Sequence, residues 1–216
     1  IAVFQMLVTP PRPEQTLLRS LRRFFRGCAR ILDGYAPHRS GARARRLRKR
    51  HYASVVLPVP QHLRAVVKRL DFKMSPRDDA EKMDHLLNGL QSICYRLQAL
   101  ELAHGRADRA SADLTGSIGA LLGQLRVRME GVFDQWARFE RCQTLNERAA
   151  LQELSKSLEQ ELGTVAGDER LDQLDDQALT SVYALLGCAR GLIRAMAETQ
   201  GALDRINWDR WAEARF

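Results

Sequence analysis

Apolar residues recur at intervals of three and four along most of this chain, and this spacing constrains its fold more than any other feature. An α-helix collects residues at these intervals onto one face, which must then be buried against another element. The clearest stripe lies in residues 76–104 and consists of Leu86, Leu87, Leu90, Ile93, Cys94, Leu97 and Leu100. Similar stripes predict further helices over residues 14–34, 61–71, 107–143, 147–162 and 175–204.

The composition favours helices and gives little support for strands. Leu, Ala, Arg, Glu and Gln dominate, and these are good helix formers, whereas Val, Ile and Thr are sparse. The 216 residues are enough to bury a core. Long helices with short links predict an all-α fold, an up-and-down bundle of long antiparallel helices. We expect residues 36–60 to be irregular because they contain Pro37, Gly41, Pro58 and Pro60.

Positive charge is concentrated at the front of the chain. The net charge is +8 at pH 7, but residues 1–70 carry 16 Lys and Arg against two acidic residues. Residues 71–216 are acidic overall, so the asymmetry indicates an anionic partner at the N-terminal end.

The first predicted helix carries a continuous basic stripe. Its members recur at helical spacing and are Arg19, Arg22, Arg23, Arg26 and Arg30. A basic amphipathic helix of this kind is typical of a membrane surface, where we expect these arginines to face anionic lipid headgroups. An ordinary bundle helix with a solvated arginine face explains the pattern equally well.

A second basic segment lies in residues 43–50, where six of the eight residues are Arg or Lys. It is consistent with a solvated loop, with contacts to anionic lipid headgroups, or with contacts to nucleic-acid phosphates. A nucleic-acid module usually adds stacking aromatic residues, and Tyr52 alone does not supply them. Nucleic acid is therefore not an expected partner.

The sequence contains no recognisable catalytic or metal-binding motif. Phosphate-binding, dinucleotide-binding, zinc-protease and hydrolase signatures are absent, and the five histidines show no ligand spacing. We therefore expect no enzyme activity, no catalytic residue, no cofactor and no metal site. The cysteines are scattered among apolar residues and are interpreted as core residues in a reducing compartment: Cys28, Cys94, Cys142 and Cys188.

Two smaller features predict contacts between elements. The G-x-x-x-G pairs Gly119/Gly123 and Gly187/Gly191 predict close packing of helices. Near the end of the chain, Trp208 and Trp211 either dock on the bundle or lie at a headgroup layer.

The chain begins with an apolar segment, IAVFQMLV, followed by a Pro-rich connector. Eight such residues are too short to span a bilayer, which takes roughly 20. We interpret residues 1–13 as the end of a truncated membrane span with its connector; an apolar edge packed on the core is the alternative.

Residues 10–32, PPRPEQTLLRSLRRFFRGCARIL, resemble the stretch that follows the first membrane bundle in the fusaric acid resistance/aromatic acid exporter family of inner membrane proteins. The segment INWDRW, residues 206–211, is similar to the stretch leading into the second bundle. The resemblance implies that residues 14–205 form a cytoplasmic helical domain and that residues 206–216 link it to a second membrane bundle.

The resemblance also implies proton-driven efflux of aromatic carboxylic acids or related toxic compounds from a bacterial inner membrane. No transport residue can be assigned within these 216 positions. The expected partners are the transporter's own membrane bundles and anionic headgroups, and the domain would support assembly or gating. A soluble scaffold that forms homo-oligomers through its leucine stripes is the alternative.

Overall fold

Helices form almost all of the described part of the chain. The computed structural model describes residues 13–35, 42–69, 78–110, 117–138, 144–166, 175–206 and 208. In order, the elements are α1 (Pro13–Asp33), α2 (Ala42–His51), the π-helical turn η2 (Tyr52–Val56), α3 (Val59–Val67), α4 (Asp78–Ala110), α5 (Ser117–Arg138), α6 (Thr144–Ala166) and α7 (Asp176–Arg205). No strand occurs in these ranges, and the prediction of an all-α fold is confirmed.

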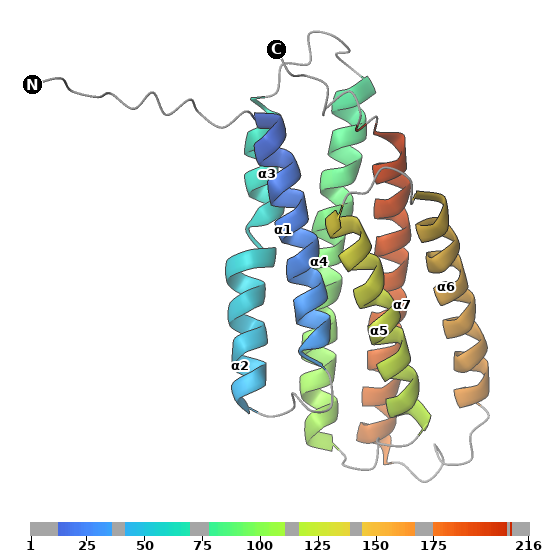
Figure 1. The fold of residues 1–216 in the computed structure, drawn as a ribbon. Helices are drawn as coiled ribbons and strands as arrows, with labels where there is room; N and C mark the ends of the chain where they lie inside the picture. Colours follow the sequence, from blue (N-terminus) through green and yellow to red (C-terminus); the bar gives the residue numbers. More distant parts are fainter. Residues whose placement is uncertain are drawn as a thin grey trace, which may run out of the picture.

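The chain direction alternates from one leg of the bundle to the next (Figure 1). In that view α1 descends, α2 and α3 rise as a single leg joined by η2, α4 descends, α5 rises, α6 descends and α7 rises. The most extensive contacts join α4 to α7 and α1 to α5, while α6 packs on α5 and α7, and α3 packs on α1 and α4. The fold is the up-and-down bundle that the leucine spacing predicts.

Several helix boundaries fall close to their predicted positions because local signals mark them. The predicted helix over 175–204 is α7, which begins one residue later at Asp176. The carboxylate of Asp175 accepts a hydrogen bond from the backbone N–H of Ala178 at 2.6 Å and so caps the first turn.

The prediction of one helix over 107–143 is wrong. α4 continues to Ala110, and a separate helix, α5, begins at Ser117. The intervening sequence, SADLTG, is rich in residues that favour helix ends over helix interiors. The apolar spacing runs on through Leu114, so periodicity alone does not reveal the break.

The prediction that residues 36–60 are irregular is also wrong for residues 42–56, which form α2 and η2. The prolines lie only near the edges of this segment. Pro58 is the N-cap of α3 and Pro60 lies in its first turn, where a missing N–H costs little. Between the prolines, Ala, Arg, Leu and Lys follow their helix propensities. The basic run 43–50 is therefore on a helix and not in a loop.

An aromatic cluster joins three helices in the core. The Phe25 ring on α1 lies 5.1 Å from the Trp136 ring on α5, and Phe133 lies 5.5 Å from the same indole. The indole N–H of Trp136 donates to the side-chain oxygen of Gln200 on α7 at 2.5 Å. The cluster therefore buries a large apolar area and also satisfies the indole's donor.

The helices α4 and α7 approach each other closely at Gly89, which the G-x-x-x-G pairs do not include. A Cβ at Gly89 would lie 2.6 Å from the hydroxyl oxygen of Thr199 and 3.3 Å from its Cα. Gly123 and Gly187 have nothing within 4 Å of such an atom, and Gly191 meets only the Arg96 side chain. The predicted packing role of those two glycine pairs is therefore wrong at Gly123 and Gly187.

Most residues at the two ends of the chain lie outside the described part of the structure. Residues 1–12, which hold the apolar segment and most of the connector, and residues 209–216 are not among the described residues. Trp208 docks on the bundle, where its indole N–H donates to the carbonyl of Leu203 at 3.0 Å. Among the described helices, none combines the length and the apolar character that crossing a membrane requires.

Candidate functional site

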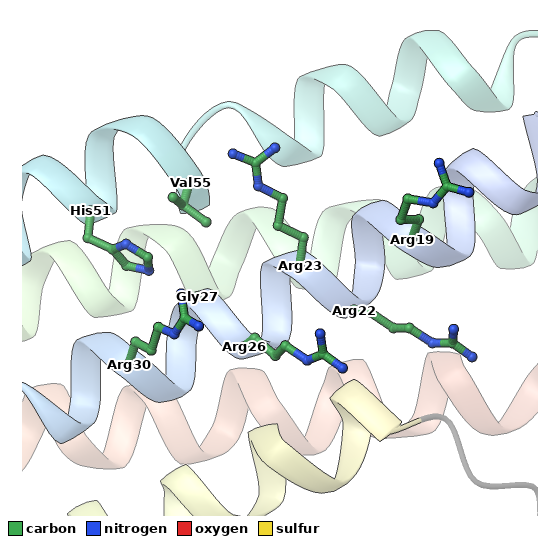
Figure 2. Close-up of a pocket in the computed structure, with 8 residues that line it drawn as sticks. All are labelled: Arg19, Arg22, Arg23, Arg26, Gly27, Arg30, His51 and Val55. Atoms are coloured by element: carbon green, nitrogen blue, oxygen red, sulfur yellow. The ribbon is translucent and has the colours of Figure 1, made fainter. Parts of the chain in front are cut away.

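The arginine stripe on α1 lines a groove on the outside of the bundle. The inner face of α1 is fully buried at Leu17, Leu21 and Phe25, and this burial turns the opposite face outward. All five arginines on that face are exposed and project from α1 in Figure 2. Together with Gly27, His51 and Val55 they line a space of about 450 Å³, which we call the arginine groove: Arg19, Arg22, Arg23, Arg26, Gly27, Arg30, His51 and Val55.

The second wall of the groove comes from the end of α2 and from η2. A Cβ at Gly27 would lie 3.0 Å from a methyl carbon of Val56 and 3.1 Å from one of Val55. The glycine therefore lets η2 approach α1 closely and places His51 beside the arginines. The sequence interpretation missed His51 and Val55; a glycine in the middle of a strongly helical segment was the available signal for a close contact.

The lining of the groove contains five arginines and no Asp or Glu. Within the described residues, the side chains of Arg19, Arg23, Arg26 and Arg30 make no ion pair. A surface that gathers four such like charges attracts anions.

Among the residues that line the groove, His51 is the one whose charge changes near neutral pH, because the arginines stay charged. Its Nε2 atom is buried and has no hydrogen-bond partner in the described part of the chain. The imidazole points toward α1 in Figure 2, with Nε2 at 3.7 Å from where a Cβ of Gly27 would lie. Burial, followed by the charges of Arg30 and Arg23, lowers the pKa of His51 below its usual 6.5. The imidazole is therefore neutral at neutral pH.

The second basic segment, on α2, is partly committed to internal structure. Arg48 is buried: its Nε donates to Glu101 on α4 at 3.1 Å, and an Nη donates to the carbonyl of Gly34 at 2.5 Å. The guanidinium lies 4.5 Å from the ring centre of Tyr35, whose hydroxyl donates to Glu101 at 2.6 Å. Arg48 thus fixes α2 to α1 and α4 and is not available to a partner.

The other candidate reactive groups are spread through the fold. Cys28 and Cys94 are buried, as predicted, and Cys188 is half-buried, while Cys142 lies outside the described residues. Burial raises the pKa of Cys94 to about 12 and that of Cys28 well above its usual range, so both thiols are protonated and poorly nucleophilic. Among the described residues, no group of three or more His, Cys, Asp or Glu side chains could hold a metal ion.

Comparisons with models of protein families, with curated proteins and with solved structures find no match to this chain.

Proposed function

We propose that this chain is the helical domain of an inner-membrane efflux transporter for aromatic carboxylic acids or related toxic compounds. The domain faces the cytoplasm and supports assembly or gating of the transporter. Two observations support the proposal: the resemblance of residues 10–32 and 206–211 to the exporter family, and the exposed arginine face of α1.

An anionic membrane surface fits the shape and charge of that face. From Arg19 to Arg30 the stripe extends about 16 Å along α1. A basic residue near an anionic headgroup layer contributes about 1 kcal/mol. Five such residues on one face, without carboxylates among them, therefore favour a surface-bound orientation in which α1 lies along the inner leaflet.

Vesicle binding tests the surface role directly. The full chain should co-sediment with phosphatidylcholine vesicles that contain phosphatidylglycerol and should remain in solution with phosphatidylcholine alone. The pair of changes Arg19→Gln and Arg26→Gln should reduce binding to the anionic vesicles at least tenfold.

A matched control removes the same charge elsewhere. Arg190 and Arg194 on α7 are exposed and pair with Glu159 and Glu198. The changes Arg190→Gln and Arg194→Gln should leave vesicle binding unchanged. Equal losses for the two double variants would overturn the role of the arginine face, since only net charge would then matter.

The transporter assignment has a separate test. The complete reading frame should encode several apolar spans of roughly 20 residues on either side of this domain. A full-length protein without such spans contradicts the assignment, whatever the vesicles show.

The alternative of a homo-oligomeric scaffold depends on leucine stripes that are free to contact a second copy of the chain. The leucine stripes of α5 and α6 are buried within the same chain at Leu121, Leu125, Leu151, Leu154 and Leu158. These side chains pack in the core of the chain, so they are not available to contact a second copy.

A further inference from the structure

We propose that the arginine groove binds a phosphomonoester group at a seat formed by Arg23, Arg30 and His51, and that its binding is coupled to protonation of His51. The inference rests on the proposed function, because it assigns a partner chemistry to the same groove. It goes beyond that function by naming a discrete seat in place of a diffuse charged surface.

The first argument is the charge that the ligand must carry. Five guanidinium groups border a space of about 450 Å³ with no carboxylate among the lining residues. A phosphomonoester carries close to two negative charges near pH 7 and offers three strong acceptor oxygens. Guanidinium forks match such oxygens in geometry as well as in charge. A carboxylate or a phosphodiester, with a single negative charge, neutralises less of the groove.

The second argument is the position of His51. Because Gly27 has no side chain, η2 and the end of α2 lie against α1, and the imidazole faces the arginine stripe across the groove (Figure 2). Arg23 and Arg30 are two turns apart on α1, and the charges of both act on the imidazole. A phosphate bound between these groups meets donors from both walls.

The third argument is the unused hydrogen-bonding capacity of His51. Its Nε2 is buried without a partner among the described residues. From α1, Arg30 and Arg23 lower the pKa of the imidazole; α2 itself carries no acidic residue, and η2 contributes only the Tyr52 hydroxyl, which donates to the Cys94 carbonyl. A bound phosphate offsets the two arginine charges and accepts a hydrogen bond from a protonated Nε2. The pKa of His51 must therefore rise on binding.

The basic segment of α2 does not offer a comparable seat. Its buried member, Arg48, already binds Glu101 and the Gly34 carbonyl. Its neighbours Arg46, Lys49 and Arg50 are exposed and do not line the arginine groove. The phosphate seat is therefore assigned to α1 and to the junction of α2 with η2.

The histidine itself reports on the seat. The His51 ring resonance of the full chain is titrated with pH by NMR, at constant ionic strength, in sodium chloride, in dimethyl phosphate and in glycerol 3-phosphate; the change His51→Gln assigns the signal. Glycerol 3-phosphate should raise the pKa of His51, while the diester should not. No rise with the monoester, or an equal rise with all three salts, would overturn the proposal.

Affinity measurements on variants separate the seat from general electrostatics. The changes Arg23→Gln and Arg30→Gln together should weaken glycerol 3-phosphate binding at least tenfold, and the changes Arg190→Gln and Arg194→Gln should leave it unchanged. His51→Gln should retain binding at pH 8. Between pH 8 and pH 6 the ester, whose second pKa is about 6, also takes up protons, so the affinity of His51→Gln should fall relative to that of the wild-type chain. Circular dichroism confirms that each variant is folded. If the affinity of His51→Gln for glycerol 3-phosphate depends on pH in the same way as that of the wild-type chain does, binding is not coupled to protonation of His51.

Vesicles distinguish a lipid headgroup from a soluble ligand. If the phosphate belongs to a lipid, vesicles containing phosphatidate should bind more tightly than phosphatidylglycerol vesicles of matched surface potential, and the preference should disappear in His51→Gln. If glycerol 3-phosphate shifts His51 but no vesicle binds, the seat stands with a soluble ligand and the membrane role fails. If both vesicles bind equally and His51 does not respond, the membrane role stands and the seat fails. A single-stranded oligonucleotide that shifts His51 more strongly than the monoester also overturns the proposal.

Discussion

Arg48 shows how strongly the surroundings of a single residue decide its role. Six of the eight residues in 43–50 are basic, yet the Arg48 side chain is buried against Glu101 and Tyr35. Removing one member of a buried ion pair leaves the other charge without compensation, which typically costs about 3–5 kcal/mol. Arg48→Met should therefore lower the free energy of unfolding by about 3 kcal/mol in urea denaturation.

The second member of the pair supplies the control. Because Glu101→Gln removes the orphaned charge, the double variant Arg48→Met/Glu101→Gln should be more stable than Arg48→Met alone. The exposed pair of Arg194 and Glu198 should behave differently: Arg194→Met should cost well under about 1 kcal/mol. A loss at Arg48 no larger than that at Arg194 would show that the buried pair contributes nothing.

His51 gives the fold a pH dependence of known sign. Its pKa is lowered in the folded chain, so between that value and 6.5 the unfolded chain binds more protons. The contribution of the neutral imidazole is complete above pH 6.5 and is lost as the pH falls through 6.5 toward the folded value. The free energy of unfolding in chloride should therefore fall more steeply below pH 6.5 in the wild-type chain than in His51→Gln.

At the scale of elements, the α4–α7 pair depends on the absence of a side chain at Gly89. A Cβ there would meet the Thr199 hydroxyl, which is fully buried and donates to the Ala195 carbonyl at 2.8 Å, so it has no free space to move into. Gly89→Ala should gain about 1 kcal/mol of helix propensity and lose more than that to the clash, for a net loss of about 1–2 kcal/mol.

The same substitution at an open site should have the opposite sign. Gly187 lies on α7 with nothing within 4 Å of an added Cβ, so Gly187→Ala should raise the free energy of unfolding by about 0.5–1 kcal/mol. Thermal denaturation of the two variants measures the contrast. Adding Thr199→Ala to Gly89→Ala should recover part of the loss; an equal gain at both glycines would mean that the two helices do not approach closely at Gly89.

The sequence predicts one wall of the groove, on α1, but not the other wall, which α2 and η2 form. The α1 wall follows from local information: the apolar stripe fixes which way the helix faces, and the arginines occupy the opposite side. The α2–η2 wall depends on contacts between residues far apart in sequence, such as Gly27 with Val56. The prolines at 37, 58 and 60 obscured a helix whose own composition favoured it. The spacing of the histidines therefore gives no sign of a role for His51, although the fold places it in the same groove as Arg23 and Arg30.

At the scale of the whole molecule, the basic front of the chain and its acidic remainder are folded into one bundle. Residues 1–70 carry 16 Lys and Arg against two acidic residues, and the helices that they contribute, α1 to α3, lie on one side of Figure 1. The resulting field is uneven, and on the described part of the surface the arginine groove gathers five arginines with no carboxylate in its lining. A surface of this kind favours anion binding and at the same time opposes folding through self-repulsion.

The destabilisation caused by this self-repulsion can be measured by varying the salt concentration. On α1 the arginines form five like-charge pairs three or four residues apart, each worth about 0.2–0.5 kcal/mol of destabilisation at low salt. Replacing Arg19, Arg23, Arg26 and Arg30 by Gln should therefore raise the Tm by about 2–10 °C at ~0.01 M salt, where the screening length is about 30 Å. At ~0.15 M salt the length falls to about 8 Å and the gain should shrink. The same number of changes to Gln at Arg128, Arg138, Arg190 and Arg194, outside the groove, should not raise the Tm. A quadruple groove variant that is no more stable than the wild-type chain at low salt would show that the arginines are already neutralised within the protein, and the groove would then have no excess charge to offer an anion.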